Sequence, residues 1–284
     1  MTAGEINEVP DYIGLLSEMC DDFDLFQRSK KFALNPRVPA HLTLIYGLKC
    51  HAHYMVRRCL PLLAESTIVA VPIVRSVFEC GVMAQWLRWF PGSEDSLLEE
   101  SHRQMATLTK DLSRSKRPHY QEGAARLSTH PALTEWPDLS EEAPAHAAKF
   151  AAICRAFYAG AEVYIDYRFL SGCTHAGTML AAAWLDPDRT RPRIRHTPQE
   201  PFTVERLGRV ALLALGWSSR AFDDLGYKSP RSDFLNSVEQ RTGLDLWLQP
   251  KPTPTRGTTP VRVTGSLAAL ATALRHPVNP RDVL

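Results

Sequence analysis

Apolar side chains recur at three- and four-residue steps through most of this chain, a spacing typical of amphipathic α-helices. In residues 11–31 acidic side chains lie between the apolar positions and basic ones end the segment, as the helix dipole favours. The same spacing predicts a second helix from Ala40 to about Ala64, with a bend near Pro61. The pattern therefore predicts that the chain begins with helices rather than strands.

The segment that begins at Thr67 is apolar on nearly all sides and ends at a Pro-Gly pair. It is far longer than a typical strand, so we predict a central helix that is buried on most sides. A fourth helix is expected from Ser93 to about Ser115, with an acidic first turn and a charged outer face. Residues 116–139 contain several prolines and a glycine, which predict an irregular excursion between helices.

Periodic segments return after this excursion and predict further helices over about 141–158, 161–185, 203–225 and 229–242. An arginine-rich loop follows the second of these, and any strand in it is expected to be short. Beyond Leu248 the chain loses periodicity and is rich in Pro and Thr, which predicts a flexible tail over 249–284 with a short helix near its end. We therefore predict an all-α protein, in which residues 1–248 form one antiparallel helical bundle with additional C-terminal helices.

Charge and cysteine usage exclude few classes of protein. The 284 residues include 33 basic and 31 acidic ones, and a formal net charge of +2 gives no global field that favours nucleic acid or membrane. No apolar run is long enough for an uninterrupted membrane span, and the N-terminus has no signal-like segment. We therefore expect a cytoplasmic protein with no membrane partner. The six cysteines lack C-x-x-C spacing and lie in apolar surroundings, as reduced core thiols do.

The clearest candidate site lies in the run Y-I-D-Y-R-F-L-S-G-C-T-H-A-G at 164–177, where polar side chains interrupt an apolar helix. At about 100° per residue, Arg168 and His175 lie within about 20° of each other on that helix, with Ser171 between them. Because the flanking positions are apolar, this polar stripe is expected to face another protein element or an internal cleft.

An earlier helix contains the partners that such a stripe needs. The run V-R-S-V-F-E places Arg75 and Glu79 at i and i+4, on one face of the predicted central helix. Their apolar neighbours would desolvate both charges, and desolvated charges must be paired and hydrogen-bonded. One interpretation is a structural lock, in which Arg75, Glu79 and a Ser or His opposite hold two helices together without chemistry.

The second interpretation is a catalytic site. His175 would donate or accept a proton near neutral pH, with Glu79 as its partner carboxylate. Arg168 or Arg75 would hold a phosphate. Cleavage of RNA without a metal needs only a base, an acid and a cation, because the attacking 2′-hydroxyl belongs to the substrate.

The remaining polar and aromatic residues suggest substrate contacts rather than a metal or cofactor. Ser171, Tyr164 and Tyr167 are candidate substrate-binding residues, and core packing is the alternative for the two tyrosines. Ser171 does not fit a nucleophile, because the G-x-S-x-G elbow is absent. His51 and His53 lie about 200° apart on a helix, so they cannot hold a metal together. No metal and no cofactor are indicated.

The pairing of R-S-V-F-E on one helix with Y-R-F-L-S-G-C-T-H on a later one resembles a family of bacterial helical proteins known as a domain of unknown function. This resemblance covers roughly Ala40 to Leu185. More remotely, Arg168 and His175 are similar to the Arg-x(4 to 6)-His signature of the HEPN superfamily, four-helix-bundle ribonucleases common in toxin and antiviral systems. That resemblance implies RNA cleavage by Arg168 and His175 at the interface of a homodimer. The alternative is a non-catalytic helical interaction or ligand-binding module built on the same polar residues.

Overall fold

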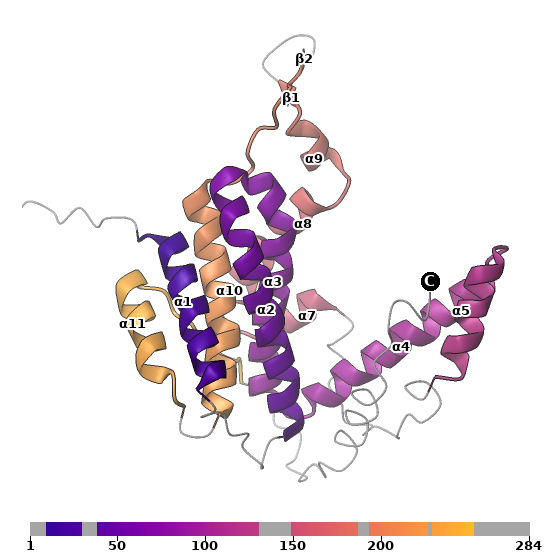
Figure 1. Cartoon of the computed structure of the whole chain (residues 1–284), viewed down its shortest axis with the longest axis horizontal. Helices are drawn as coiled ribbons and strands as arrows, with labels where there is room; N and C mark the ends of the chain where they lie inside the picture. The colour runs from indigo at the N-terminus through magenta and orange to yellow at the C-terminus, as the bar shows by residue number, and fades with distance from the viewer. Residues whose placement is uncertain (1–9, 30–38, 131–148, 187–192, 227–228, 253–284) are drawn as a thin grey trace, which may run out of the picture.

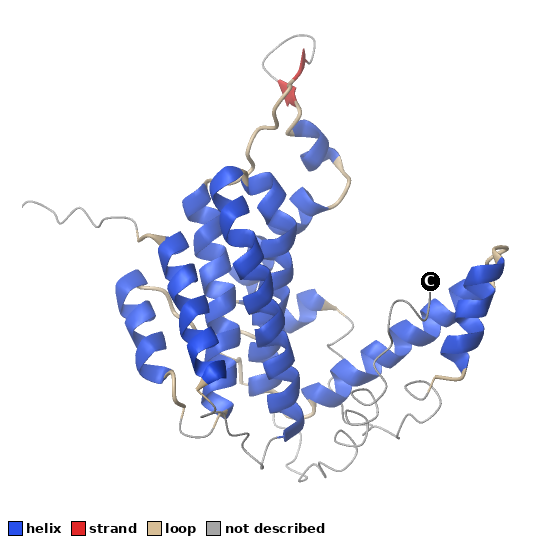
Figure 2. Ribbon diagram, in the orientation of Figure 1, coloured by secondary structure: helices blue, strands red, loops and turns tan. Residues whose placement is uncertain are grey.

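The computed structural model describes residues 10–29, 39–130, 149–186, 193–226 and 229–252. Within these ranges the regular secondary structure is helical, apart from one short pair of strands (Figure 2) and an isolated bridge between Phe157 and Pro250. The elements are α1 (Tyr12–Arg28), α2 (Pro39–Glu65), α3 (Thr67–Trp89), α4 (Ser93–Ser113), α5 (Pro118–Ser128), α7 (Phe150–Arg155), α8 (Gly160–Thr174), α9 (Thr178–Ala182), β1 (Leu185–Asp186), β2 (Arg193–Ile194), α10 (Val204–Leu225) and α11 (Ser232–Thr242). The predicted all-α fold class is confirmed.

Helix α3 lies in the middle of the bundle and packs against α2, α10 and α8 (Figure 1). Helix α1 covers α2 and α10, and α11 packs on α10. Buried residues occur on all sides of α3, as the continuous apolar run predicts. Among the described helices α3 alone is long and apolar enough to cross a membrane, with a mean hydropathy of 1.6. Its position in the core of the bundle accounts for that composition.

A side chain from far along the sequence caps the N-terminus of α3. The Glu200 carboxylate accepts hydrogen bonds from Ser66 Oγ (2.8 Å), Thr67 Oγ1 (2.6 Å) and the backbone N–H of Ile68 (2.7 Å). Burial alone would raise the pKa of Glu200, but these hydrogen bonds outweigh it and hold the pKa below its usual value. A negative charge at this end also complements the helix dipole. The chain that precedes α10 is thereby attached to the start of the core helix.

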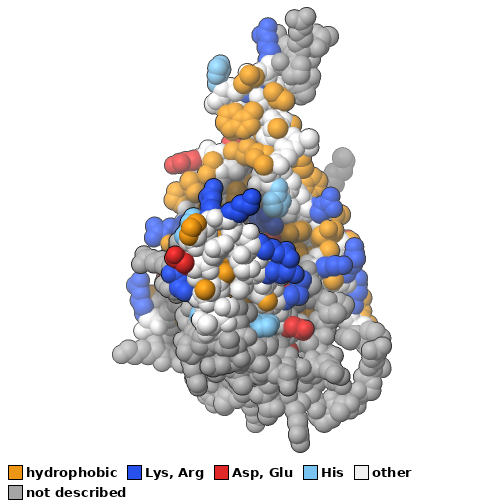
Figure 3. All heavy atoms as spheres, turned by 90° about the vertical axis from the view of Figure 1, so that its right-hand side faces the viewer, with side chains coloured by type: hydrophobic (Ala, Val, Ile, Leu, Met, Phe, Trp, Pro, Cys, Tyr) orange, Lys and Arg blue, Asp and Glu red, His pale blue; other side chains and the backbone are white. Residues whose placement is uncertain are grey.

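Helices α4 and α5 form an arm that projects from the bundle (Figure 1). The buried residues of α4 all lie within 93–98, where the helix starts beside α2 and α3. Beyond them α4 contacts mainly α5, which folds back along it. The end of this arm points toward the viewer in Figure 3. We refer below to α4 and α5 together as the arm.

The predicted irregular excursion over 116–139 is wrong for residues 118–128, which form α5. Pro118 occupies the first turn, where a missing N–H leaves no hydrogen bond unmade, so the proline starts the helix rather than breaking it. Gly123 is buried on the face of α5 that also buries Ala124 and Leu127. The rest of the predicted excursion, from residue 131 on, lies outside the described residues.

Two other predictions extend beyond the described residues. Of the helix predicted over 141–158, the part up to residue 148 lies outside them, and α7 is the part that is seen. The predicted tail is described only over residues 249–252. There Tyr158 N donates to Gln249 O (3.0 Å) and Lys251 N donates to Ala156 O (2.8 Å), so the start of this segment pairs with the chain that follows α7.

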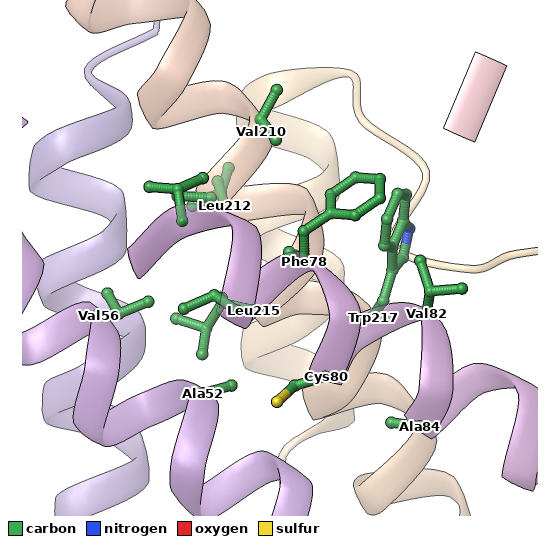
Figure 4. Close-up of a cluster of buried hydrophobic side chains, with 14 of the residues drawn as sticks. Ala52, Val56, Phe78, Cys80, Val82, Ala84, Val210, Leu212, Leu215 and Trp217 are labelled. Carbon is green, nitrogen blue, oxygen red and sulfur yellow. The ribbon is translucent and has the colours of Figure 1, made fainter. Parts of the chain in front are cut away.

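Close contact between α3 and α10 holds the core together. A Cβ at Gly81 would lie 2.4 Å from the carbonyl oxygen of Ala214, so glycine permits the two backbones to approach this closely. On the same pair of helices, the rings of Phe78 and Trp217 meet edge to face at 5.5 Å, and both are labelled in Figure 4. Because Arg75 lies on α3 as well, this packing determines where its side chain emerges.

Candidate functional site

Arg75 on α3 and His175 at the end of α8 are in direct contact. Nη1 of Arg75 lies 3.0 Å from Nε2 of His175. A guanidinium can only donate hydrogen bonds, so Nε2 must accept, and the imidazole proton is then on Nδ1. His175 is therefore a neutral imidazole in this arrangement, with its basic nitrogen directed at a cation.

Two further side chains hold the Arg75 guanidinium in place. Arg75 Nε donates to Glu79 Oε1 (3.1 Å), the i,i+4 pair that the sequence predicts. Arg75 Nη2 donates to the hydroxyl of Tyr167 (3.2 Å), and the guanidinium carbon lies 5.4 Å from the centre of that ring. We call these four residues, Arg75, Glu79, Tyr167 and His175, the Arg75 cluster. Glu79 and Tyr167 restrict the guanidinium to one orientation toward His175.

His175 reaches Arg75 because α8 ends just before it. The predicted continuous helix over 161–185 is wrong: α8 stops at Thr174, and His175 is its C-cap with an extended backbone (φ −84°, ψ 142°). The hydroxyl of Thr174 donates to the Leu170 carbonyl (2.7 Å), which competes with the helical hydrogen bonds of the last turn. Gly177, also extended, precedes the short helix α9. The imidazole therefore leaves the helical stripe on which the sequence placed it.

Arg168 and Ser171, the other members of the predicted stripe, are not part of the cluster. Arg168 is exposed on α8, and within the described ranges no hydrogen bond or ion pair joins it to His175. Ser171 Oγ is buried without a hydrogen-bond partner among the described residues, while its carbonyl accepts from the backbone N–H of His175 (3.1 Å). The arginine that meets the histidine is thus Arg75, from a different helix.

Aromatic residues of α7 and α8 pack against Tyr167 of the cluster. The ring of Tyr167 packs on Phe150 of α7 (4.4 Å between centroids) and is stacked with Tyr164 (6.0 Å). These contacts hold Tyr167 where it can accept from Arg75. Tyr164 contacts Tyr167 through its ring and forms no hydrogen bond with Arg75 among the described residues.

The cluster is open to solvent on one side. His175 is exposed, 38% of the Glu79 side chain is accessible, and Arg75 retains 18%. Large apolar side chains are also exposed on α8 and in the segment that follows it, where Figure 3 shows orange side chains toward the top. We call these residues the apolar face: Ile165, Phe169, Met179, Trp184, Leu185 and Ile194. The cluster is therefore not the fully buried polar network that a closed structural lock between the two helices would require.

The chain matches no protein-family model, no curated protein and no solved structure. Within the described part of the chain, no group of three or more His, Cys, Asp or Glu side chains could hold a metal ion. The chemistry available at the Arg75 cluster is that of an imidazole base, a guanidinium, a phenol and a carboxylate.

Lys49 is a second unusual group, and it is not among the residues predicted from the sequence. Its side chain is fully buried on α2, its Nζ has no hydrogen-bond partner among the described residues, and Nζ lies 4.5 Å from the centre of the Phe23 ring. Burial, and then the charge of Arg231, lower the pKa of Lys49 to about 7. Lys49 lies four residues after Ile45 and three before Ala52, which are both buried. This helical spacing places Lys49 on the buried face of α2, and it was the feature of the sequence that could have predicted a buried lysine.

Proposed function

We propose that the Arg75 cluster is the active centre of a metal-independent ribonuclease, in which His175 is the general base and Arg75 holds the phosphate. The observation that carries this proposal is the 3.0 Å contact between Arg75 Nη1 and His175 Nε2 in a position open to solvent. A neutral imidazole beside a cation is suited to removing a proton next to a phosphate. The remote resemblance of Arg168 and His175 to the signature of the HEPN ribonucleases also favours RNA cleavage, although in this proposal Arg75 takes the role that the resemblance gives to Arg168.

Substrate binding would release the base. A phosphate oxygen is a stronger acceptor than a neutral imidazole, so it displaces His175 from Arg75 Nη1 and frees the lone pair of Nε2. Nε2 then takes the proton of the 2′-hydroxyl, and the 2′-oxygen bonds to phosphorus as the bond to O5′ breaks. The products are a 2′,3′-cyclic phosphate and a 5′-hydroxyl. Tyr167 accepts from Arg75, so its own O–H hydrogen is free to pass to the leaving O5′.

The other predicted residues have supporting roles in this proposal. Glu79 is a positioning residue, because it orients Arg75 and does not meet the reacting atoms. Arg168, exposed on α8 before the helix ends, is a contact for a neighbouring phosphate. Removing Arg168 should therefore raise KM and leave kcat within a few-fold of the wild-type value.

A non-catalytic helical module, in which the cluster joins α3 to α8, is the second candidate. It is favoured by the mutual hydrogen bonding of the four side chains, in which Glu79, Tyr167 and His175 all accept from Arg75. Such a junction needs no substrate. Its loss would lower stability and change no reaction rate.

The deciding experiment is cleavage of a mixed structured RNA in the presence of a chelator. Wild-type protein is expected to cleave, and His175→Ala and Arg75→Ala to lose at least about 100-fold in rate, as removal of a general base or a phosphate-binding cation does. His51→Ala is the matched control, because His51 is also exposed and should leave the rate unchanged. Thermal melting of each variant separates loss of chemistry from loss of fold.

Three outcomes are distinguishable in this experiment. Cleavage that is lost in both cluster variants, with cyclic-phosphate ends in the wild-type products, supports the ribonuclease. Inert wild-type protein together with less stable cluster variants supports the structural junction. Wild-type rates in well-folded His175→Ala protein would exclude His175 as the base.

The proposal includes a homodimer formed through the apolar face beside the cluster. Exposed apolar side chains gathered in one region are typical of protein interaction sites. Sedimentation velocity should show a dimer for wild-type protein, and a monomer after Ile165→Asp combined with Phe169→Asp. A monomeric wild type over the accessible concentration range would remove the dimer from the proposal and leave the cluster chemistry unaffected.

A cytoplasmic location completes the proposal. All six cysteines are free thiols, as expected in a reducing compartment. Burial raises the pKa of Cys59, Cys80 and Cys154 to about 12, so these thiols remain protonated and unreactive. Fractionation of the native cells, followed by immunodetection of the protein, tests the assignment.

A further inference from the structure

The distal half of the arm has an excess of basic side chains at its surface. Between residues 110 and 126 the chain has five basic side chains and two acidic ones, Asp111 and Glu122, a formal charge of +3 in a protein whose net charge is +2. The basic residues are Lys110, Arg114, Lys116, Arg117 and Arg126. The end of the arm therefore has a local excess of positive charge in a chain that is close to balanced as a whole.

These five charges are not neutralised by neighbours. All five side chains are exposed, and none forms an ion pair with another described residue. Arg103, nearer the bundle on α4, differs: it makes a two-pronged contact with Glu100, at 2.7 and 2.8 Å. Figure 3, which looks at the end of the arm, shows Lys and Arg side chains around the part nearest the viewer. The charge at the end of the arm is thus available to an external anion.

The first turn of α5 combines this charge with aromatic rings. The ring of His119 lies 4.2 Å from that of Tyr120, and the guanidinium carbon of Arg117 lies 6.0 Å from the centre of the same ring. Basic side chains beside rings are the combination that binds phosphates and stacked bases in single-stranded nucleic acids. Leu108, which is 45% exposed, is the one large exposed hydrophobic side chain on the described arm, and a single leucine does not form the apolar face of a membrane-surface helix.

We propose that the distal half of the arm, from Lys110 to Arg126, is an RNA-binding surface separate from the Arg75 cluster. The basic side chains contact the phosphate backbone, and Tyr120 with His119 offers rings to an unpaired base. The arm binds RNA whether or not the cluster cleaves it, so this inference does not depend on the proposed ribonuclease. For a ribonuclease, the arm would retain substrate without contributing to the chemical step.

The test measures binding of a fluorescein-labelled single-stranded RNA by anisotropy in a His175→Ala background, which prevents cleavage. The arm variant carries Arg114→Gln, Lys116→Gln and Arg117→Gln. It is expected to bind roughly 10- to 100-fold more weakly at low salt, with a slope of log K against log salt that is smaller by about 2. The matched control removes three exposed arginines outside the arm: Arg28→Gln, Arg58→Gln and Arg155→Gln. The control loses the same net charge as the arm variant but keeps the arm intact, so it should bind RNA like the parent protein.

A second variant tests the rings. Tyr120→Leu should weaken single-stranded RNA binding several-fold and leave the salt slope unchanged, because stacking releases no counterions. All substitutions lie at the surface of the arm or the bundle, and circular dichroism confirms that each variant is helical.

Several results would overturn the inference. Parent protein that does not bind the RNA excludes it, as does an arm variant with unchanged affinity and salt slope. Equal weakening by the control triple would show that net charge alone is responsible. Binding to phosphatidylserine vesicles but not to RNA, lost in the arm variant, would assign the surface to a membrane instead. A protein that binds RNA through the arm but never cleaves it would retain this inference and reject the ribonuclease.

Discussion

Arg75 and His175 are 100 residues apart in the sequence, and their side chains share a hydrogen bond of 3.0 Å. One comes from the core helix α3 and the other from the cap of α8. The contact makes the imidazole nitrogen an acceptor and the guanidinium its donor. The catalytic proposal and the structural alternative both depend on this single relationship, so its energy is the first quantity to measure.

A double-mutant cycle should find this contact energetically real and modest. For Arg75→Gln, His175→Ala and the double variant, we expect a coupling in the free energy of unfolding of about 0.5–1.5 kcal/mol, because the pair is only partly buried. Urea denaturation at pH 8 measures it. The same cycle with His51→Ala in place of His175→Ala should give a coupling near zero. No measurable coupling between Arg75 and His175 would contradict the contact.

Replacing the buried Lys49 should stabilise the protein. Its ammonium has no hydrogen-bond partner among the described residues, so Lys49→Met removes an uncompensated buried charge and retains most of the side-chain volume. The expected gain in the free energy of unfolding is about 1–3 kcal/mol at pH 6. Chemical denaturation of the two proteins at this pH provides the comparison.

The stabilising effect of Lys49→Met should depend on pH. Burial lowers the pKa of Lys49 from 10.5 to about 7, so between these values the unfolded chain binds the proton more tightly than the folded protein. The destabilisation is therefore fully present below pH 7 and decreases as pH rises toward 10.5. Lys49→Met should remove this rise in stability, whereas Lys110→Met on the exposed arm should leave it unchanged. An identical pH profile for Lys49→Met and wild type would refute the assignment.

Removing the carboxylate that caps α3 should weaken the fold and its response to acid. Hydrogen bonds hold the pKa of Glu200 below 4.5 against the effect of burial, so the stability it contributes is present above pH 4.5 and is lost as pH falls through the folded-state pKa. Glu200→Gln should lower the free energy of unfolding by about 1 kcal/mol at pH 7. Thermal melts at pH 7 and pH 4 test this, with exposed Glu122→Gln as control. Equal losses at both pH values would contradict a charged cap.

The two glycines Gly81 and Gly47 should respond in opposite directions to alanine. A methyl group at Gly81 would meet the Ala214 carbonyl oxygen at 2.4 Å, so Gly81→Ala should destabilise by about 1–3 kcal/mol as α3 and α10 separate. Gly47 lies exposed within α2 with nothing near its added methyl, so Gly47→Ala should stabilise by up to about 1 kcal/mol. Calorimetric melting of both variants decides. Wild-type stability for Gly81→Ala would mean that the helices are less closely packed.

Periodicity was sufficient to predict most of the bundle. Helices α1, α2 and α10 lie where the apolar spacing predicted them, because each packs an apolar face against the bundle. Helix α3 lies where the length of its apolar run predicted it, and α4 lies where its acidic first turn predicted it. Helix α5 was not predicted because a proline usually indicates the end of a helix, whereas Pro118 lies in the first turn of α5. The break after Thr174 was missed because the flanking residues are helical in composition, and a hydroxyl with a nearby glycine was enough to end α8.

The candidate site was only partly predictable for a different reason. The i,i+4 relation of Arg75 and Glu79 follows from helix geometry and is observed. Whether Arg75 or Arg168 meets His175 depends on how α3 and α8 pack and on where α8 ends, and neither is encoded in local spacing. The sequence therefore identified the residues of the cluster but left open which arginine completes it.

The cap formed by Glu200 and the contact made by His175 lie on the same helix. Glu200 is attached to the first turn of α3 and His175 to Arg75 two turns further along the same helix, so the chain between them is a loop with both ends fastened to one rod. Releasing the Glu200 end would lengthen that loop only slightly, because the Phe202 carbonyl still accepts from Thr67 Oγ1 (2.9 Å) and α10 begins at Val204. Loop-closure entropy grows only with the logarithm of loop length, so the imidazole should remain as close to Arg75 as before. The cap of α3 therefore contributes stability that can be removed without releasing the base.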